Sequence, residues 1–258
     1  MSLTPAQVHE KKAEITSPGG IFELEDIEIE GHSYRQYKHA PKTLLDVFNG
    51  ARAHGDLEFI VYEGRRYSYN QFFAEVDALA ASLQLDLGIG HGDCIALAMR
   101  NNPEWAVVYV AATIIGAIVV PVNSWGKAEE LTYALEDSGS RILVCDEPRY
   151  RLISDRVETL GVTVLLVGAE PDQKGVQSFE SLVAAGQGRE YDIPEISPLD
   201  DCVILYTSGS TGFPKGVLHR QVSACQSLMN MFYLGYLLME LEGPREFKGG
   251  ADRETPML

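Results

Sequence analysis

Short apolar runs alternate with amphipathic segments along most of the chain. Apolar runs rich in β-branched residues predict strands at 94–99, 118–120, 142–145, 162–167 and 202–206. Apolar residues spaced three and four apart predict helices at 43–52, 69–87, 127–138, 149–160 and 221–238, with another beginning near Pro103. Strands that are apolar throughout and alternate with helices indicate right-handed βαβ crossovers. The predicted fold class is therefore α/β, with a mainly parallel sheet flanked by helices.

The pattern also divides the chain into three parts. Residues 1–40 are polar and irregular, which predicts an N-terminal arm on the surface. Residues 41–240 carry the alternating elements, including a β-hairpin around Glu63-Gly64, and form the main domain. Residues 187–198 are polar and read as a long loop before the last predicted strand, and residues 241–258 form a polar tail.

The composition limits the classes of partner. The chain has 258 residues, and its 21 Lys plus Arg against 37 Asp plus Glu give a net charge of -16, which repels nucleic acid and anionic membrane surfaces. The four cysteines lie far apart without zinc-ligand spacing, so we expect buried, reduced thiols and no metal site built from them.

The sequence predicts a cytoplasmic protein without a membrane span. The N-terminus (MSLTPAQVHEKKAEI) has no apolar run of the kind found in a secretory signal peptide. The longest apolar stretch, 106–120, contains Gly116 and is shorter than the roughly 20 residues that cross a bilayer.

The residues that carry chemistry follow the predicted strand 202–206. Glycines there permit positive φ and close backbone approach, so that successive N–H groups can converge on phosphate oxygens. Hydroxyl groups add donors, and one lysine supplies positive charge. The predicted phosphate-binding residues are Thr207, Ser208, Gly209, Ser210, Thr211, Gly212, Lys215 and Gly216.

Three better-known motifs do not fit. The Walker pattern fails because Pro214 stands where a glycine precedes the lysine, and Gly216 stands where Ser or Thr is needed. The dinucleotide pattern fails because Asp93 replaces the third glycine after Gly88 and Gly90. The chain also lacks the GxSxG elbow of a serine hydrolase.

The segment YTSGSTGFPKGV at 206–217 resembles the signature loop of the adenylate-forming (AMP-binding) superfamily, which includes acyl-CoA synthetases, peptide-synthetase adenylation domains and firefly-type luciferases. Segments that look like other landmarks of that superfamily occur in its order: RYSY at 66–69, GDCIAL at 92–97, NNPEW at 101–105, VPVN at 120–123 and LEDSG at 135–139. The chain therefore resembles an N-terminal portion of an acyl-CoA synthetase or fatty-acid–CoA ligase, and the resemblance implies the large N-terminal domain of such enzymes.

The resemblance implies an ATP-dependent ligase. Such enzymes join a small carboxylic acid to ATP, release pyrophosphate and pass the acyl group to a thiol, so the implied cofactors are ATP, Mg²⁺ and coenzyme A. Residues 207–211 and Lys215 would bind the β- and γ-phosphates. For His219 two interpretations stay open: a supporting role on the phosphate side, or a solvated residue at a strand end.

Several family motifs do not occur in these 258 residues. The acyl-pocket, magnesium, ribose and catalytic-lysine motifs are missing, as is the mobile C-terminal domain, so no catalytic residue is assigned. We expect this portion to be inactive by itself and, with an open sheet edge, to self-associate as a homo-oligomer. The alternatives are an adenylation enzyme that loads a carrier protein and a non-catalytic nucleotide-binding partner.

Overall fold

The computed structural model describes residues 4–207 and 214–242, and their contacts divide the chain into two compact units. The larger unit is Leu44–Gln221, and the smaller one combines Met1–Thr43 with Val222–Leu258. The first and last residues of the larger unit are joined, because the Leu44 N–H donates a 2.9 Å hydrogen bond to Gln221 Oε1. Among the described residues, no helix has the length and apolar character needed to cross a membrane.

The larger unit is built on a seven-stranded sheet with the order β11-β10-β6-β5-β7-β8-β9. Its strands are β5 (Cys94–Ala98), β6 (Ile118–Pro121), β7 (Ile142–Asp146), β8 (Thr163–Val167), β9 (Val176–Ser178), β10 (Asp201–Thr207) and β11 (Lys215–Arg220). All neighbours pair in parallel except β10 and β11, which are antiparallel. The predicted α/β class with a mainly parallel sheet is confirmed.

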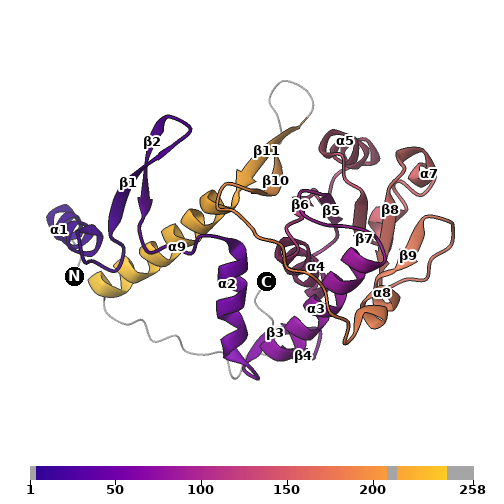
Figure 1. Cartoon of the computed structure of the whole chain (residues 1–258), viewed down its shortest axis with the longest axis horizontal. Helices are drawn as coiled ribbons and strands as arrows, with labels where there is room; N and C mark the ends of the chain where they lie inside the picture. The colour runs from indigo at the N-terminus through magenta and orange to yellow at the C-terminus, as the bar shows by residue number, and fades with distance from the viewer. Residues whose placement is uncertain (1–3, 208–213, 243–258) are drawn as a thin grey trace. The chain divides into compact units, whose positions relative to one another are not determined.

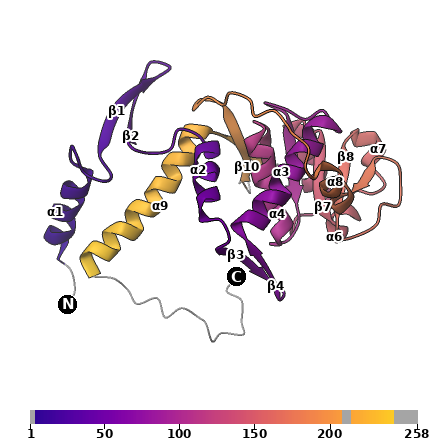
Figure 2. The same cartoon turned by 60° about the horizontal axis from the view of Figure 1, so that its bottom comes forward.

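Helices cover both faces of this sheet (Figure 1). One face carries α2 (Leu44–Ala51), α3 (Tyr69–Leu85), α4 (Pro103–Ile114) and α8 (Phe179–Gly186), and the other carries α5 (Ala128–Ser138), α6 (Glu147–Tyr150) and α7 (Val157–Leu160). Each face has its own apolar core, because strands such as β5 send alternate side chains to opposite sides. Helix α3 packs against both α4 and α8 (Figure 2).

The single helix predicted at 149–160 is wrong. The chain forms the two short helices α6 and α7, because Tyr150 and Ile153 accept hydrogen bonds from N–H groups three residues later, at 3.0 and 2.8 Å. These tighter turns place Ile153, which is fully buried, in the core with α5 and β8. The free energy gained by burying the Ile153 side chain thus exceeds that of one continuous helix over these residues.

The sequence patterns missed β9 and α8. Ser178 begins α8, since its Oγ accepts a hydrogen bond from the Ser181 N–H at 3.1 Å. Gly186 lets the helix approach α3 closely: a Cβ there would lie 1.8 Å from the Ala78 carbonyl oxygen. A buried hydrogen bond of 2.8 Å from Ser82 Oγ to the Leu182 carbonyl completes the contact.

The predicted hairpin is confirmed as β3 (Glu58–Tyr62) and β4 (Arg65–Ser68). Its two turn residues, Glu63 and Gly64, both have positive φ, as a tight two-residue hairpin turn requires. Ser68 and Gln71 then form a capping box that starts α3.

In the smaller unit, the prediction that residues 1–40 are irregular is wrong. The segment forms α1 (Pro5–Thr16) and a hairpin of β1 (Leu24–Ile29) and β2 (His32–Tyr37), and α9 (Gln221–Glu242) completes the unit. The polar composition of this segment obscured two features. Thr4 begins α1 with a capping box. Phe22 is buried and its ring packs against Tyr37, Tyr233 and Tyr236.

Candidate functional site

The predicted phosphate loop is closed by the β10–β11 hairpin. Thr207, the last residue of β10, pairs with Lys215, the first residue of β11, and Thr207 Oγ1 donates to the Lys215 carbonyl oxygen at 3.4 Å. The stem therefore holds the two ends of the loop side by side at the carboxyl end of β10. Ser208, Gly209, Ser210, Thr211 and Gly212 lie outside the described residues.

Lys215 is exposed at the base of the loop, and it forms no ion pair with any described residue. Its ammonium group can therefore take an external anion as a partner. Because the whole chain carries a net charge of -16, such a local cation is needed to bind a phosphate. Within the described residues this is the feature that best fits the predicted site.

The positive φ predicted for Gly216 is wrong, whereas its phosphate-binding role stays a prediction. Its φ is not positive, so left-handed geometry does not explain the glycine. A Cβ at this position would instead lie 3.0 Å from Ile204 Cγ2 and 3.4 Å from the ring of Tyr206. The absence of a side chain at Gly216 thus leaves room for the Ile204 and Tyr206 side chains of the facing strand.

A cleft of about 310 Å³ opens beside both ends of the loop. Its walls come from the carboxyl ends of β6 and β10 and from α5, and its lining residues are Pro121, Val122, Asn123, Glu130, Tyr133, Ala134, Tyr206, Thr207 and Pro214. Ligands of α/β proteins bind at this edge of the sheet, where the strands end. The lining carries the Glu130 carboxylate and no basic side chain, so the positive charge nearest in sequence is that of Lys215, which follows the lining residue Pro214.

Tyr206 connects the loop stem to α5. Its hydroxyl donates a 2.7 Å hydrogen bond to Asp137 Oδ2. Burial, and then the hydrogen bond to Asp137, raise the pKa of the Tyr206 hydroxyl above its ordinary value, so it stays a protonated donor. No sequence pattern predicts this contact, because Tyr206 and Asp137 lie far apart in the chain.

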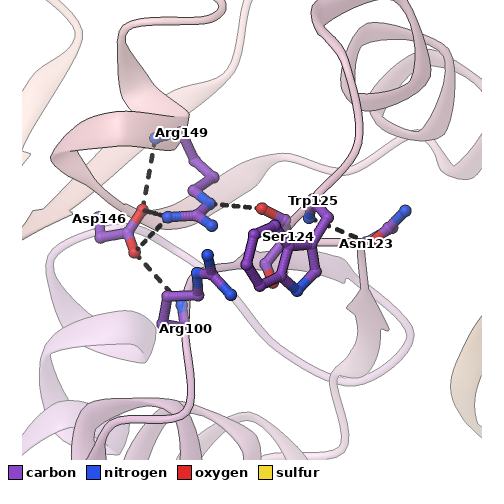
Figure 3. A network of polar contacts seen from close by, with 6 residues as sticks. All are labelled: Arg100, Asn123, Ser124, Trp125, Asp146 and Arg149. Carbon is purple, nitrogen blue, oxygen red and sulfur yellow. Dashed lines mark hydrogen bonds and ion pairs between the residues drawn. The ribbon is translucent and has the colours of Figure 1, made fainter.

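A second polar network supports the segment that follows β6 (Figure 3). Arg149, which is 9% exposed, donates from Nε to the Ser124 carbonyl oxygen at 2.7 Å and from Nη1 to Asp146 Oδ2 at 3.1 Å. Asp146 also accepts from the Arg100 backbone N–H at 3.2 Å. The ends of β5, β6 and β7 are thus tied together, which fixes the cleft residue Asn123 next to Ser124.

Trp125 lies on the outer side of this network. Trp125 is 75% exposed, and the Arg100 guanidinium lies 3.1 Å from the centroid of its ring (Figure 3). The backbone N–H of Trp125 also donates to Asn123 Oδ1 at 3.1 Å, which closes a turn over residues 123–125. Sequence patterns did not single out Arg100 or Arg149, and they marked Asn123 only as the last residue of the family-like segment VPVN.

His219 lies on β11, four residues beyond Lys215, and pairs with Val203. At roughly 3.3 Å per residue, its Cα is about 13 Å along the strand from that of Lys215. The Cys202 thiol donates to the His219 carbonyl oxygen at 3.2 Å, which engages the backbone and leaves the imidazole uninvolved. A supporting role for the imidazole stays a prediction.

The described residues contain no cluster of three side chains from His, Cys, Asp and Glu that could hold a metal ion. The cysteines form no disulfides: Cys145, Cys202 and Cys225 are buried and Cys94 is half-buried, as predicted except for the partial exposure of Cys94. Burial raises the pKa of the Cys145 thiol, which makes it a poor nucleophile.

Residues 47–243 match the family model described as AMP-binding enzyme. The chain belongs to the AMP-binding enzyme family. The match includes all seven strands of the large sheet and the whole signature loop, which confirms the resemblance inferred from residues 206–217.

Among curated relatives of this AMP-binding enzyme chain, crotonobetaine/carnitine–CoA ligase of Salmonella arizonae is 35% identical over 160 residues, covering 60% of the chain and 31% of the relative. The long-chain-fatty-acid–CoA ligase FadD13 of Mycobacterium tuberculosis is 31% identical over 178 residues, covering 66% and 34%. The chain thus spans about a third of the length of the curated relatives it matches.

Solved structures agree on the fold. The anthranilate CoA ligase AuaEII, in complex with anthranoyl-AMP, superposes with a TM-score of 0.64 over 69% of this chain and 35% of that one, at 24% identity. The AMP-binding enzyme chain therefore has the fold of adenylate-forming N-terminal domains, as predicted.

Proposed function

We propose that the chain is the ATP-phosphate-binding part of an AMP-forming acid–thiol ligase. The observation that carries this proposal is the Thr207–Lys215 stem at the edge of a cleft: it joins the ends of a hydroxyl- and glycine-rich segment, and Lys215 forms no ion pair with any described residue. Family membership supports the same chemistry, because both relatives described above are CoA ligases.

In this proposal the loop binds the β- and γ-phosphates of ATP. Backbone N–H groups and hydroxyls of residues 207–212 donate to phosphate oxygens, and Lys215 adds one positive charge. When a carboxylate attacks the α-phosphorus, the bond to the bridging oxygen breaks and negative charge builds on the departing pyrophosphate. Lys215 and the loop stabilise that charge, so their role is electrostatic and they transfer no proton.

The nature of the acid and of the acceptor thiol belongs to the same proposal. The relatives act, by name, on crotonobetaine or carnitine and on long-chain fatty acids, so an aliphatic acid and coenzyme A are the first pair to test. Mg²⁺ would arrive on the phosphates of ATP, since the described residues offer no metal cluster. We place the ligase in the cytoplasm and allow for self-association.

We further propose that these 258 residues bind nucleotide without completing the reaction. The family motifs for ribose, for magnesium and for the catalytic lysine do not occur among them. Exchange of pyrophosphate into ATP by this protein, with any aliphatic acid, would contradict this part of the proposal. In an active ligase that contains this sequence, the acceptor is identified by measuring acyl transfer to coenzyme A and, separately, to a carrier protein.

Titration calorimetry with ATP, ADP and AMP in the presence of Mg²⁺ tests the proposed site. Because the loop contacts the outer phosphates, affinity should fall in the order ATP, ADP, AMP, with about tenfold lost for each phosphate removed. Equal affinity for ATP and AMP would show that the nucleotide is held by its base and ribose elsewhere. A Lys174→Ala variant, which removes an exposed lysine outside the site, is the matched charge control.

A further inference from the structure

We infer that Tyr206 is a positioning residue for the phosphate loop, and that its hydrogen bond to Asp137 fixes the loop stem on α5. This inference rests on the proposed function. It assigns a specific task to two residues that touch no phosphate, and it names the contact through which helix α5 acts on the loop.

The position of Tyr206 supports this role. It is the next-to-last residue of β10, directly before Thr207, and its side chain points to α5, where the hydroxyl lies 2.7 Å from Asp137 Oδ2. The opposite residue of β11 is Gly216, whose missing side chain leaves room for the Tyr206 ring. A Cβ at 216 would already touch the ring at 3.4 Å, so a side chain longer than alanine would compete with the ring for this space.

The chemistry of Asp137 supports the same conclusion. Asp137 lies in the last turn of α5, where the helix dipole disfavours a carboxylate, and that turn carries no basic residue. The carboxylate is instead bound by two phenol hydroxyls, Tyr206 at 2.7 Å and Tyr133 at 3.4 Å. The Tyr133 ring also packs edge-on against the Tyr206 ring, with centroids 6.3 Å apart. The hydrogen bond to Tyr206 therefore accounts for a carboxylate at a helix position where the dipole disfavours it.

The cleft gives the contact its functional meaning. Tyr133, Tyr206 and Thr207 all line it, so a shift of the Tyr206 ring moves one wall of the cleft together with one end of the loop. Fixing the stem in advance reduces the ordering that a polyphosphate must bring about when it binds. Loss of the bond should therefore weaken polyphosphate binding even though no group that contacts phosphate is removed.

Hydrogen exchange of the intact 258-residue protein tests the contact without any ligand. In Tyr206→Phe, which removes only the hydroxyl, the amides of the paired stem, residues 205–207 and 215–217, should exchange roughly threefold to tenfold faster than in the wild type. Tyr191→Phe is the matched control, because it removes another 2.7 Å tyrosine–aspartate bond in the same unit, to Asp77. Unchanged exchange in Tyr206→Phe, or complete exchange of these amides in the wild type at the earliest time, overturns the inference.

Binding of Mg²⁺-ATP tests its consequence. Tyr206→Phe and Asp137→Ala should each bind roughly threefold to tenfold more weakly than the wild type, and the double variant no more weakly than either one. Asp137→Asn keeps an acceptor oxygen and should restore most of the affinity. Additive losses in the double variant contradict the contact. Absence of binding in the wild type counts against the proposed function alone, because the exchange experiment still decides the role of Tyr206.

Discussion

The Tyr191 hydroxyl donates a 2.7 Å hydrogen bond to Asp77 Oδ1, and the same carboxylate binds both terminal nitrogens of Arg52, at 2.9 and 2.6 Å. Arg52 in turn lies 4.3 Å from the centroid of the Phe73 ring. Tyr191 belongs to the long loop before β10, and Asp77 belongs to α3. The loop that leads to β10 is therefore fastened to the helical layer of the larger unit.

We predict that Tyr191→Phe lowers the free energy of unfolding by about 1 kcal/mol, the usual contribution of one half-buried hydrogen bond. Urea denaturation measures the change. Tyr62→Phe is the control, since no described hydrogen bond uses its hydroxyl, and its free energy of unfolding should stay within about 0.5 kcal/mol of the wild type. Equal losses in both variants would mean that the bond to Asp77 contributes nothing specific.

Low pH should weaken a second contact of the loop before β10, at Asp200, the residue that directly precedes the strand. His91 Nε2 lies 2.8 Å from Asp200 Oδ2, and this contact holds the pKa of the Asp200 carboxyl below its usual range. A lowered folded-state pKa stabilises the protein above the unfolded value, near 3.9, and the stabilisation disappears as pH falls through the folded value. The stability difference between the wild type and Asp200→Asn should therefore shrink below about pH 4.

Asp192→Asn is the control for this pH experiment, because the described structure engages Asp192 through its backbone only. Its stability should differ from that of the wild type by the same amount at pH 3 and pH 6. A wild-type advantage over Asp200→Asn that persists unchanged at pH 3 would show that the carboxylate is not the group responsible.

Gly216→Ala should disturb the loop stem. The added Cβ would lie 3.0 Å from Ile204 Cγ2, so the Ile204 side chain must shift by a few tenths of an ångström, at an expected cost of about 1 kcal/mol in the free energy of unfolding. Gly50→Ala is the opposite case: Gly50 lies in α2 with nothing within 4 Å of the new atom. That variant should be stabilised by roughly 0.5 kcal/mol, as expected for alanine in a helix. Thermal denaturation compares the two, and stabilisation by Gly216→Ala would refute the close approach.

Arg149→Ala should destabilise the larger unit by about 3 kcal/mol, because it removes the buried partner of Asp146 and the donor to the Ser124 carbonyl oxygen. Arg149→Lys should recover only part of the loss, since an ammonium group does not reproduce the Nε and Nη1 donors together. Arg141→Ala removes a half-exposed arginine that binds Asp93, and should cost less than about 1 kcal/mol. Similar costs for Arg149→Ala and Arg141→Ala would contradict the structural role of Arg149.

The parallel sheet could be predicted from the sequence because its strands are apolar on both faces and thus stand out as short continuous runs. The hairpin around Glu63 and the start of α3 at Ser68 were equally local signals. Local patterns failed where tertiary contacts decide. The helix predicted at 149–160 is interrupted where Ile153 packs in the core. The polar segment before residue 40 is ordered because Phe22 packs against apolar residues of α9.

The signature loop of the family was recognised because its residues are contiguous, whereas the residues that surround it are distant in sequence and were not. Tyr206 and Asp137 meet only after α5 has packed beside β10 and β11, and Arg149 reaches Ser124 only after β6 and β7 have been placed in the sheet. The positive φ expected for Gly216 was wrong for a related reason: the tight contact at this glycine is with Ile204 on the facing strand, which the spacing of glycines along the chain does not reveal.

The most direct test of the central claim compares the affinity of the wild type, Lys215→Ala and Lys174→Ala for Mg²⁺-ATP by titration calorimetry at low salt. If Lys215 and the loop bind the polyphosphate, Lys215→Ala should weaken binding by about tenfold or more, whereas Lys174→Ala should match the wild type. The difference between wild type and Lys215→Ala should also narrow as salt is added, since the lost contact is a charge on the surface. Equal affinity of the wild type and Lys215→Ala would contradict the account.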